Sequence, residues 1–202
     1  MRPPMPDADP TPAAAAPSPA GRLPAPPELR LVQEFVNTND MLVGVDELRS
    51  PEALATWLVE RGLLPAGATA TEAELQHAVR VREAVRTFLS RDRGQPSELE
   101  IGLLDDVGRR ARLQWSFDAG GSVQLKARSP GVIGALGTIL SPLLSAAVTG
   151  SLSRLKTCRN CRWVFYDYSK NRSGTWCAMS LCGSRAKARR HYRRMREASS
   201  SG

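Results

Sequence analysis

Apolar residues recur at helical spacing through most of residues 29–110 and are separated by short polar breaks. Leu29, Val32 and Val36 fall on one side of a helix that the polar stretch NTND would end. Later stretches carry their own start signals, a serine before a proline or a Ser/Thr-x-x-Glu capping box. The pattern predicts four amphipathic helices, which begin near Leu29, Pro51, Glu72 and Glu98.

The period of the pattern changes after residue 112. Trp115 and Phe117 alternate with polar residues before the turn sequence DAGG, and the alternation resumes behind it. This predicts a β-hairpin, with both aromatic side chains in the core of the sheet. The following apolar stretch predicts a buried helix that Pro142 kinks or breaks. Residues 29–150 are therefore expected to form a predominantly helical domain with one small hairpin.

The ends of the chain differ from this domain in composition. Residues 1–28 are rich in proline and alanine and contain few large apolar side chains, so we expect a disordered leader. Residues 198–202 are expected to form a disordered tail. We find neither the compact apolar run of a secretory signal nor a stretch of about 20 apolar residues for a bilayer. A cytoplasmic protein without a membrane partner is therefore predicted, in a compartment that keeps thiols reduced.

Positive charge is concentrated at the C-terminal end. Residues 151–202 contain 13 Lys and Arg against two acidic residues, a net charge of +11, whereas residues 1–150 carry 15 basic and 18 acidic residues, a net charge of −3. The two sums give the +8 of the whole chain. A polyanionic partner is therefore expected for the C-terminal module alone.

All four cysteines lie within this basic module. They form two pairs, Cys158 with Cys161 and Cys177 with Cys182, with 15 residues between the pairs. A CxxC pair and a second pair returned by a hairpin give a tetrahedral set of thiolates, which favours one structural Zn²⁺. The alternatives are an iron–sulfur cluster, a redox CxxC pair, and cysteines that are merely buried.

The residues around the cysteines suggest how the second pair returns. RWVFYDY is expected to form a strand, SKNRSG a turn, and TWC the returning strand. Arg159, Arg162 and Arg185 are adjacent to the sulfur ligands and can offset the negative charge of a four-thiolate zinc site. Asp167 is expected to cap the turn through Ser169 or to pair with an arginine. The fold class is thus α+β, with a small C-terminal zinc finger, a hairpin followed by a helix, over residues 151–197.

The C-terminal sequence resembles the CGNR-type zinc finger, which has the pattern C–x–x–C, F–x–D–x–S, W–C–x–M–x–x–C–G–N–R–x–K. The matching positions are Cys158, Cys161, Phe165, Asp167, Ser169, Trp176, Cys177, Met179, Cys182, Gly183, Arg185 and Lys187. Members usually carry this finger behind an ABATE domain, described as a stress-induced transcription regulator, whose opening resembles LRLVQEFVNTND. The chain departs from the pattern at Ser184, in place of asparagine, and at Gly174 and Thr175, where arginines are expected.

The segment after Cys182 is predicted to be a basic helix. Ala188, Tyr192 and Met195 fall on one side, through which the helix would pack on the finger, and the basic residues cover the opposite arc. Such a face suits DNA phosphates or the major groove. The candidate nucleic-acid contacts are Arg185, Lys187, Arg189, Arg190, Arg193 and Arg194. The alternative is a solvated basic face with no partner.

The N-terminal domain offers a second candidate site. Polar or aromatic side chains that could line a pocket for an unknown small-molecule effector are Asn37, Thr38, Trp57 and Arg82. The alternative assigns helix capping to Asn37 or Thr38 and core packing to Trp57. We find no phosphate loop, no nucleophile motif and no paired carboxylates placed for hydrolysis, so we expect no enzyme activity.

Three functions follow from these features. The first is a DNA-binding regulator with a sensory helical domain. The second is an RNA-binding or ribosome-associated finger, which uses the same charges. The third is a protein-interaction module with a purely structural zinc. The sequence leaves the oligomeric state open.

Overall fold

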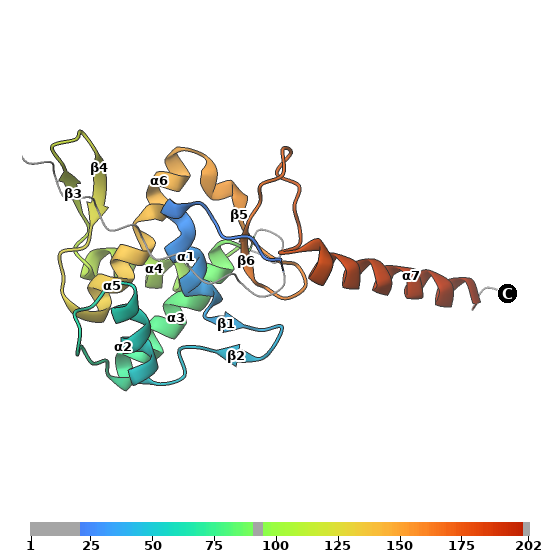
Figure 1. Ribbon diagram of the computed structural model, residues 1–202, viewed down its shortest axis with the longest axis horizontal. Helices are drawn as coiled ribbons and strands as arrows, with labels where there is room; N and C mark the ends of the chain where they lie inside the picture. The colour runs from blue at the N-terminus through green and yellow to red at the C-terminus, as the bar shows by residue number, and fades with distance from the viewer. Residues whose placement is uncertain (1–20, 91–94, 200–202) are drawn as a thin grey trace, which may run out of the picture.

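The computed structural model describes residues 21–90 and 95–199 (Figure 1). A helical body is followed by a small finger and by one long helix that projects from it. The helices of the body are α1 (Pro27–Asn37), α2 (Pro51–Glu60), α3 (Glu72–Phe88), α4 (Glu98–Arg110), α5 (Gly131–Leu140) and α6 (Pro142–Val148). The four predicted amphipathic helices and the break at Pro142 are confirmed.

Local sequence signals set the beginnings of three helices. The Ser50 side chain accepts a hydrogen bond from the Ala53 N–H at the start of α2. Capping boxes open α3, through Thr71 and Glu74, and α4, where Ser97 has the same role. Each of these interactions spans three residues, so the sequence alone contains the information needed to predict it.

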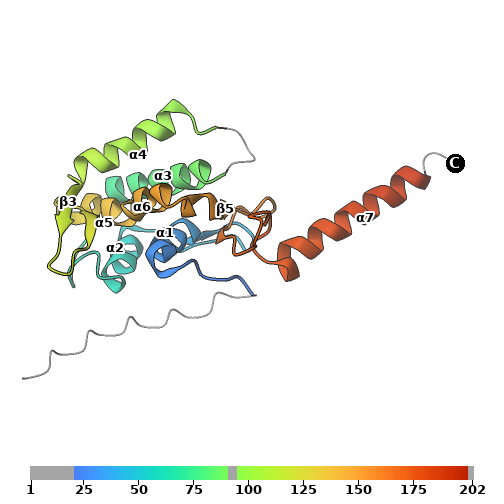
Figure 2. The same ribbon diagram turned by 90° about the horizontal axis from the view of Figure 1, so that it is seen from above.

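The hydrophobic core is centred on α1. Leu29, Val32, Phe35 and Val36 are fully buried, and α3, α5 and α6 pack around them. Figure 2 shows α4 outside α3, on the side away from α1. The burial of one α1 face explains why its apolar positions follow the helical period.

The body has one more hairpin than predicted. Strands β1 (Asn39–Asp40) and β2 (Val45–Asp46) pair directly after α1. The expected hairpin forms from β3 (Gln114–Phe117) and β4 (Val123–Lys126). Both are antiparallel, and the first is too short to leave an alternating pattern in the sequence.

The prediction that the aromatic residues of β3 lie in a sheet core is wrong. Trp115 is 61% and Phe117 75% exposed. They pair across the hairpin with Leu125 and Val123, so one face of this ribbon is apolar and open. Alternation correctly predicted the strands, but it does not determine whether another layer covers the apolar face.

The finger begins with a short 3₁₀ helix, η1 (Ser151–Arg154), and strands β5 (Leu155–Thr157) and β6 (Val164–Tyr166). β5 pairs with β6, so the hairpin lies on either side of the CxxC turn. The predicted pairing of RWVFYDY with TWC is therefore wrong. Residues 175–177 return beside the turn, where the Arg159 N–H donates to the Thr175 carbonyl.

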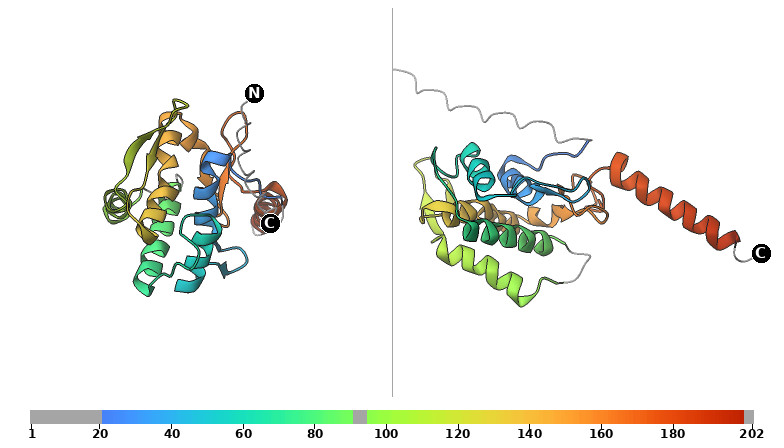
Figure 3. Two further views of the ribbon diagram at one scale, coloured as in Figure 1. Left: turned by 60° about the vertical axis from the view of Figure 1, so that its left-hand side comes forward. Right: turned by 90° about the horizontal axis from the view of Figure 1, so that it is seen from below.

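The last helix, α7 (Ser184–Ser199), follows a single π-helical turn, η2 (Met179–Gly183). It extends away from the rest of the protein, as Figure 1 and the right-hand view of Figure 3 show. The predicted tail at 198–202 overlaps the end of this helix, and its residues 200–202 lie outside the described residues.

The predicted leader also needs a correction. Residues 1–20 lie outside the described residues, but two of residues 21–28 are buried against the protein. Arg22 is 5% and Ala25 1% exposed, and α1 already begins at Pro27. Gln33 of α1 holds this segment, because its side chain bonds the Ala25 N–H and the Leu23 carbonyl.

One stretch, Gly131–Val148, is long and apolar enough to cross a bilayer by length and composition. Pro142 divides it into α5 and α6, and Val132, Leu136 and Ile139 of α5 are buried in the core. These contacts are those of a core helix.

Candidate metal centre and basic helix

Four cysteines from three parts of the finger meet at one point. Cys158 and Cys161 lie in the turn between β5 and β6, Cys177 follows the long loop behind β6, and Cys182 lies in η2. All four are buried free thiols, and their sulfur atoms lie within 4.8 Å of one another.

The spacing of the sulfur atoms fits a single zinc ion. A Zn–S bond of about 2.3 Å places the sulfurs of a regular tetrahedron about 3.8 Å apart. The Sγ of Cys177 lies 3.6 Å from that of Cys161 and 3.8 Å from that of Cys182. Four thiolates in a closed set are the usual ligands of structural zinc, so the cysteines form one structural zinc site.

The electrostatics of the bare thiols disfavour the thiolate form at Cys161 and Cys177. The hydrogen bond that Cys177 shares with Cys158, together with burial, raises the pKa of Cys177 to about 12. Hydrogen bonds with Cys158 and Cys177, and then burial, raise the pKa of Cys161 as well. Four neighbouring thiolates therefore do not coexist in this buried site unless a metal ion offsets their charge.

Backbone hydrogen bonds shape the turn that carries the first pair. The Cys158 N–H donates to the Trp163 carbonyl at 2.8 Å, and the Arg162 N–H donates to the Cys158 carbonyl at 3.0 Å. Arg162 has a φ of 60°, in the left-handed region, so the chain reverses directly after Cys161. The CxxC spacing and this reversal bring both sulfurs to the same side of the turn.

Asn160 links the metal centre to α7, a role that the sequence analysis missed. Its side-chain NH₂ donates to the Cys182 sulfur at 3.4 Å, and its side-chain oxygen accepts from Arg189 at 2.6 Å. Groups in this position orient the metal ligands and tune their basicity. The position of Asn160 between Cys158 and Cys161 was the feature of the sequence that could have indicated this role.

Arg22 approaches the same centre from the N-terminal segment. Its guanidinium lies 3.9 Å from the centre of the Trp163 ring and forms a 2.5 Å ion pair with Asp40. Burial opposes its charge, but Asp40 and then the Cys177 sulfur outweigh burial and raise the pKa of Arg22. A cation beside Cys177 offsets part of the negative charge of a four-thiolate zinc site.

Asp167 fixes the loop between the two cysteine pairs. Its carboxylate accepts from the Ser169 N–H at 3.0 Å, the Gly174 N–H at 2.8 Å and the Lys156 ammonium at 2.7 Å. The turn cap was predicted, but the paired cation is Lys156 and not an arginine. A Cβ atom on Gly174 would lie 2.6 Å from the carboxylate, so this glycine is required by the close approach of Asp167.

The predicted basic residues lie on α7. Arg185, Lys187, Arg189, Arg190 and Arg193 are exposed, and the Arg194 side chain is outside the described part of the chain. The Ser184 hydroxyl donates to the Ser180 and Leu181 carbonyls where the helix begins.

The prediction that α7 packs on the finger through its apolar residues is wrong. Tyr192 is 69% and Met195 57% exposed, and Ala188 is exposed as well. The helix leaves the finger as a single rod, so its length carries these side chains beyond the reach of the small hairpin. The helical period identified the apolar side of α7 but gave no information on its neighbours.

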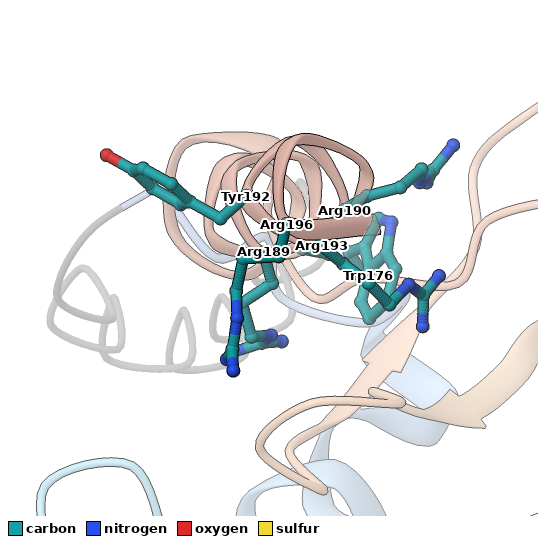
Figure 4. A pocket seen from close by; sticks show the side chains of 7 residues that line it. Trp176, Arg189, Arg190, Tyr192, Arg193 and Arg196 are labelled. Atoms are coloured by element: carbon teal, nitrogen blue, oxygen red, sulfur yellow. The ribbon is translucent and has the colours of Figure 1, made fainter. Parts of the chain in front are cut away.

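A basic groove of about 870 Å³ lies between Trp176 and α7. Its cationic lining comes from Arg189, Arg190, Arg193 and also Arg196, which the sequence analysis did not select. Figure 4 shows Arg190 and Tyr192 pointing to opposite sides of the helix. The arginines in this view lie on sides of α7 other than that of Tyr192, and Arg196 extends the basic lining further along the helix.

A second basic cavity of about 470 Å³ is lined by Lys156, Arg159 and Arg172. Lys156 is already engaged by Asp167 and by the carbonyls of Arg172 and Gly174. Arg172 donates to the Ser153 hydroxyl.

The four residues predicted to line a ligand pocket have partners within the protein. Asn37 bonds the backbone of Val164 in the finger. Arg82 is buried and donates to the Thr38 hydroxyl and to both carboxylate oxygens of Asp46. Trp57 is 4% exposed and packs 5.8 Å from the Phe35 ring. These contacts are structural, and they give the expected pocket no support.

Comparison with known families agrees with this architecture. Residues 29–152 match the ABATE family, described as "Putative stress-induced transcription regulator", and residues 154–195 match the CGNR zinc finger. Among curated proteins, none matches the sequence. The first match covers more than half of the 202 residues and the second contains all four cysteines. The chain therefore belongs to the ABATE family and ends in a CGNR zinc finger.

Proposed function

We propose that the protein is a zinc-dependent transcription regulator of the cytoplasm that binds duplex DNA through α7. The observation that carries this proposal is the exposed basic helix, which begins two residues after the last cysteine ligand. Residues 184–199 contain seven basic residues and one acidic residue. The arginines of α7 whose side chains are described are exposed, so phosphates can reach them.

The metal centre supports this function by fixing the direction of the helix. Cys182 lies in η2, immediately before α7, and Asn160 connects its sulfur to Arg189. A helix that is anchored at one end and projects from the body can enter a major groove without rearrangement of the body. The described length of α7, 16 residues, corresponds to about 24 Å at 1.5 Å per residue.

The basic groove beside Trp176 adds to the phosphate-binding surface. Arg193 and Arg196 lie further along α7 than Arg189, so the cations extend over several turns. Positive charge that is spread in this way suits a rod of phosphates better than a single anion. The family description, a stress-induced regulator, agrees with DNA as the partner.

The test measures binding of a labelled duplex by fluorescence anisotropy over a range of salt concentrations. We expect the variant with Arg189, Arg190, Arg193 and Arg194 changed to alanine to keep one zinc per chain and to lose most of its affinity. The slope of log K against log salt should fall by about 3 to 4 units, since each phosphate contact contributes about 0.9.

A matched control removes the same charge from the helical body. It changes the exposed residues Arg49, Arg80, Arg109 and Arg128 to alanine, and it should bind DNA like the parent. Equal binding by the α7 variant and the parent would refute the proposal. Tighter binding of a structured RNA than of the duplex, in direct competition, would make RNA the partner.

A further inference from the structure

The polar residues at the end of α1 contact the finger at the start of β6, directly after the turn that holds the first two cysteines. The Asn37 side chain is 6% exposed. It donates to the Val164 carbonyl and accepts from the Val164 N–H, both at 2.8 Å. Gln33, one turn earlier, also donates to the Val164 carbonyl, at 3.2 Å. The outer edge of β6 is therefore paired with side chains of the helical body.

A buried arginine of α3 makes the second connection. Arg86 is 0% exposed and donates at 2.7 Å to the carbonyl of Arg162, the residue that follows Cys161. The same guanidinium donates to the carbonyls of Val36 and Asn39 at the end of α1. Burial lowers the pKa of Arg86, although Glu83 opposes this effect. One side chain thus joins α3, the end of α1 and the metal-binding turn.

Apolar side chains of the finger also pack against the helical body. Leu155 of β5 and Val164 of β6 are 0% exposed, and they belong to the core that contains Leu29, Val36 and Val85. The cysteine cluster has its own smaller apolar shell, which includes Phe165 and Trp163. One face of the β5–β6 hairpin therefore packs on the core of the body, and the other packs on the cysteine cluster.

We propose that zinc occupancy is transmitted to the helical body through Asn37 and Arg86, which act as positioning residues for the metal-binding turn. Without metal, the four sulfurs are no longer bound to one ion, and this removes the constraint on the turn. If the turn moves, the Asn37 amide and the Arg86 cation lose partners in a buried site, which is costly. Zinc binding therefore stabilises the contacted part of the body, the end of α1 and α3, together with the finger.

This assignment gives the stretch FVNTND a different role from the ligand pocket that its polar residues suggested. It does not rest on nucleic-acid binding, because its readouts are metal affinity and backbone protection. Coupling of this kind is reciprocal. If zinc binding stabilises the contacts of the body with the turn, a change in the body that breaks these contacts must weaken zinc binding.

The first experiment compares hydrogen exchange of the zinc-loaded full chain with that of the chain treated with a chelator and a reductant. We expect removal of zinc to reduce protection in residues 155–183 and also in residues 33–40 and 82–90. Loss of protection that stops at the finger would overturn the proposal.

The second experiment measures zinc affinity by competition with a chromophoric chelator. Asn37→Ala should weaken zinc binding on the order of tenfold, the usual range of coupling between two sites. Asn39→Ala is the matched control, since the Asn39 side chain bonds Glu83 and not the finger. Equal zinc affinity of these two variants would overturn the assignment of Asn37.

A second pair of variants serves if Asn37→Ala does not fold. Arg86→Lys keeps the charge, but a single ammonium nitrogen cannot replace the three guanidinium nitrogens that reach Glu83 and the three carbonyls, so it should weaken zinc binding. Arg82→Lys alters the other buried arginine of α3, whose bonds stay within the body, and it should leave zinc affinity unchanged. Equal zinc affinities of Arg86→Lys and Arg82→Lys would overturn the assignment of Arg86.

Discussion

Replacement of Asp167 by asparagine should destabilise the protein by about 2 kcal/mol at neutral pH. Burial disfavours the charged form of Asp167, but hydrogen bonds from Lys156 and Ser169 outweigh it and lower its pKa to about 2. The ordinary value is 3.8. A difference of nearly two pKa units, at about 1.4 kcal/mol per unit, gives this magnitude. The side chain is 3% exposed, so solvent screens its ion pair little.

The sign of the pH dependence follows from the lowered pKa. A carboxylate whose pKa is lower in the folded state contributes its full stabilisation above the unfolded pKa, near 4, and loses it as the pH falls toward about 2. The loss in Asp167→Asn should therefore be constant between about pH 5 and pH 8. More acidic conditions are unsuitable, because protons compete with zinc for the thiolates.

Urea unfolding of parent and variant, both loaded with zinc, measures this difference. Asp118→Asn is the control, since Asp118 also accepts from two backbone N–H groups but lies exposed in the β3–β4 turn. A variant at position 167 as stable as the parent would refute the reasoning. So would a stability difference that changes between about pH 5 and pH 8, because another group would then titrate there.

Three further changes test particular contacts. Asn160→Ala should keep one zinc per chain but weaken its affinity about 10- to 100-fold in a chelator competition, and unchanged affinity would contradict its role at Cys182. Gly174→Ala should lower the unfolding temperature, because its Cβ would lie 2.6 Å from Asp167, whereas Gly102→Ala, which meets nothing within 4 Å, should stabilise α4 by up to about 1 kcal/mol. Tyr192→Ser should change the free energy of unfolding by less than about 0.5 kcal/mol in urea titrations, and a large loss would show that α7 packs on the protein.

The sequence by itself determined the features that depend on neighbours along the chain. Helix starts were predictable because a cap and its partner lie three residues apart, as for Thr71 and Glu74. The zinc site was predictable because a CxxC pair already places two sulfurs on one ion, and the second pair had only to return. The basic character of α7 is a property of composition alone.

Only the tertiary structure decided which surfaces meet. Asn37 and Val164 are 127 residues apart in sequence, and no local pattern distinguishes a polar side chain that binds a ligand from one that binds a distant strand. The exposure of Trp115 and Tyr192 was missed for the same reason, since periodicity defines an apolar face but not its neighbour. Periodicity and caps are local, whereas burial depends on where the chain returns, and this physical difference separates the two sets of results.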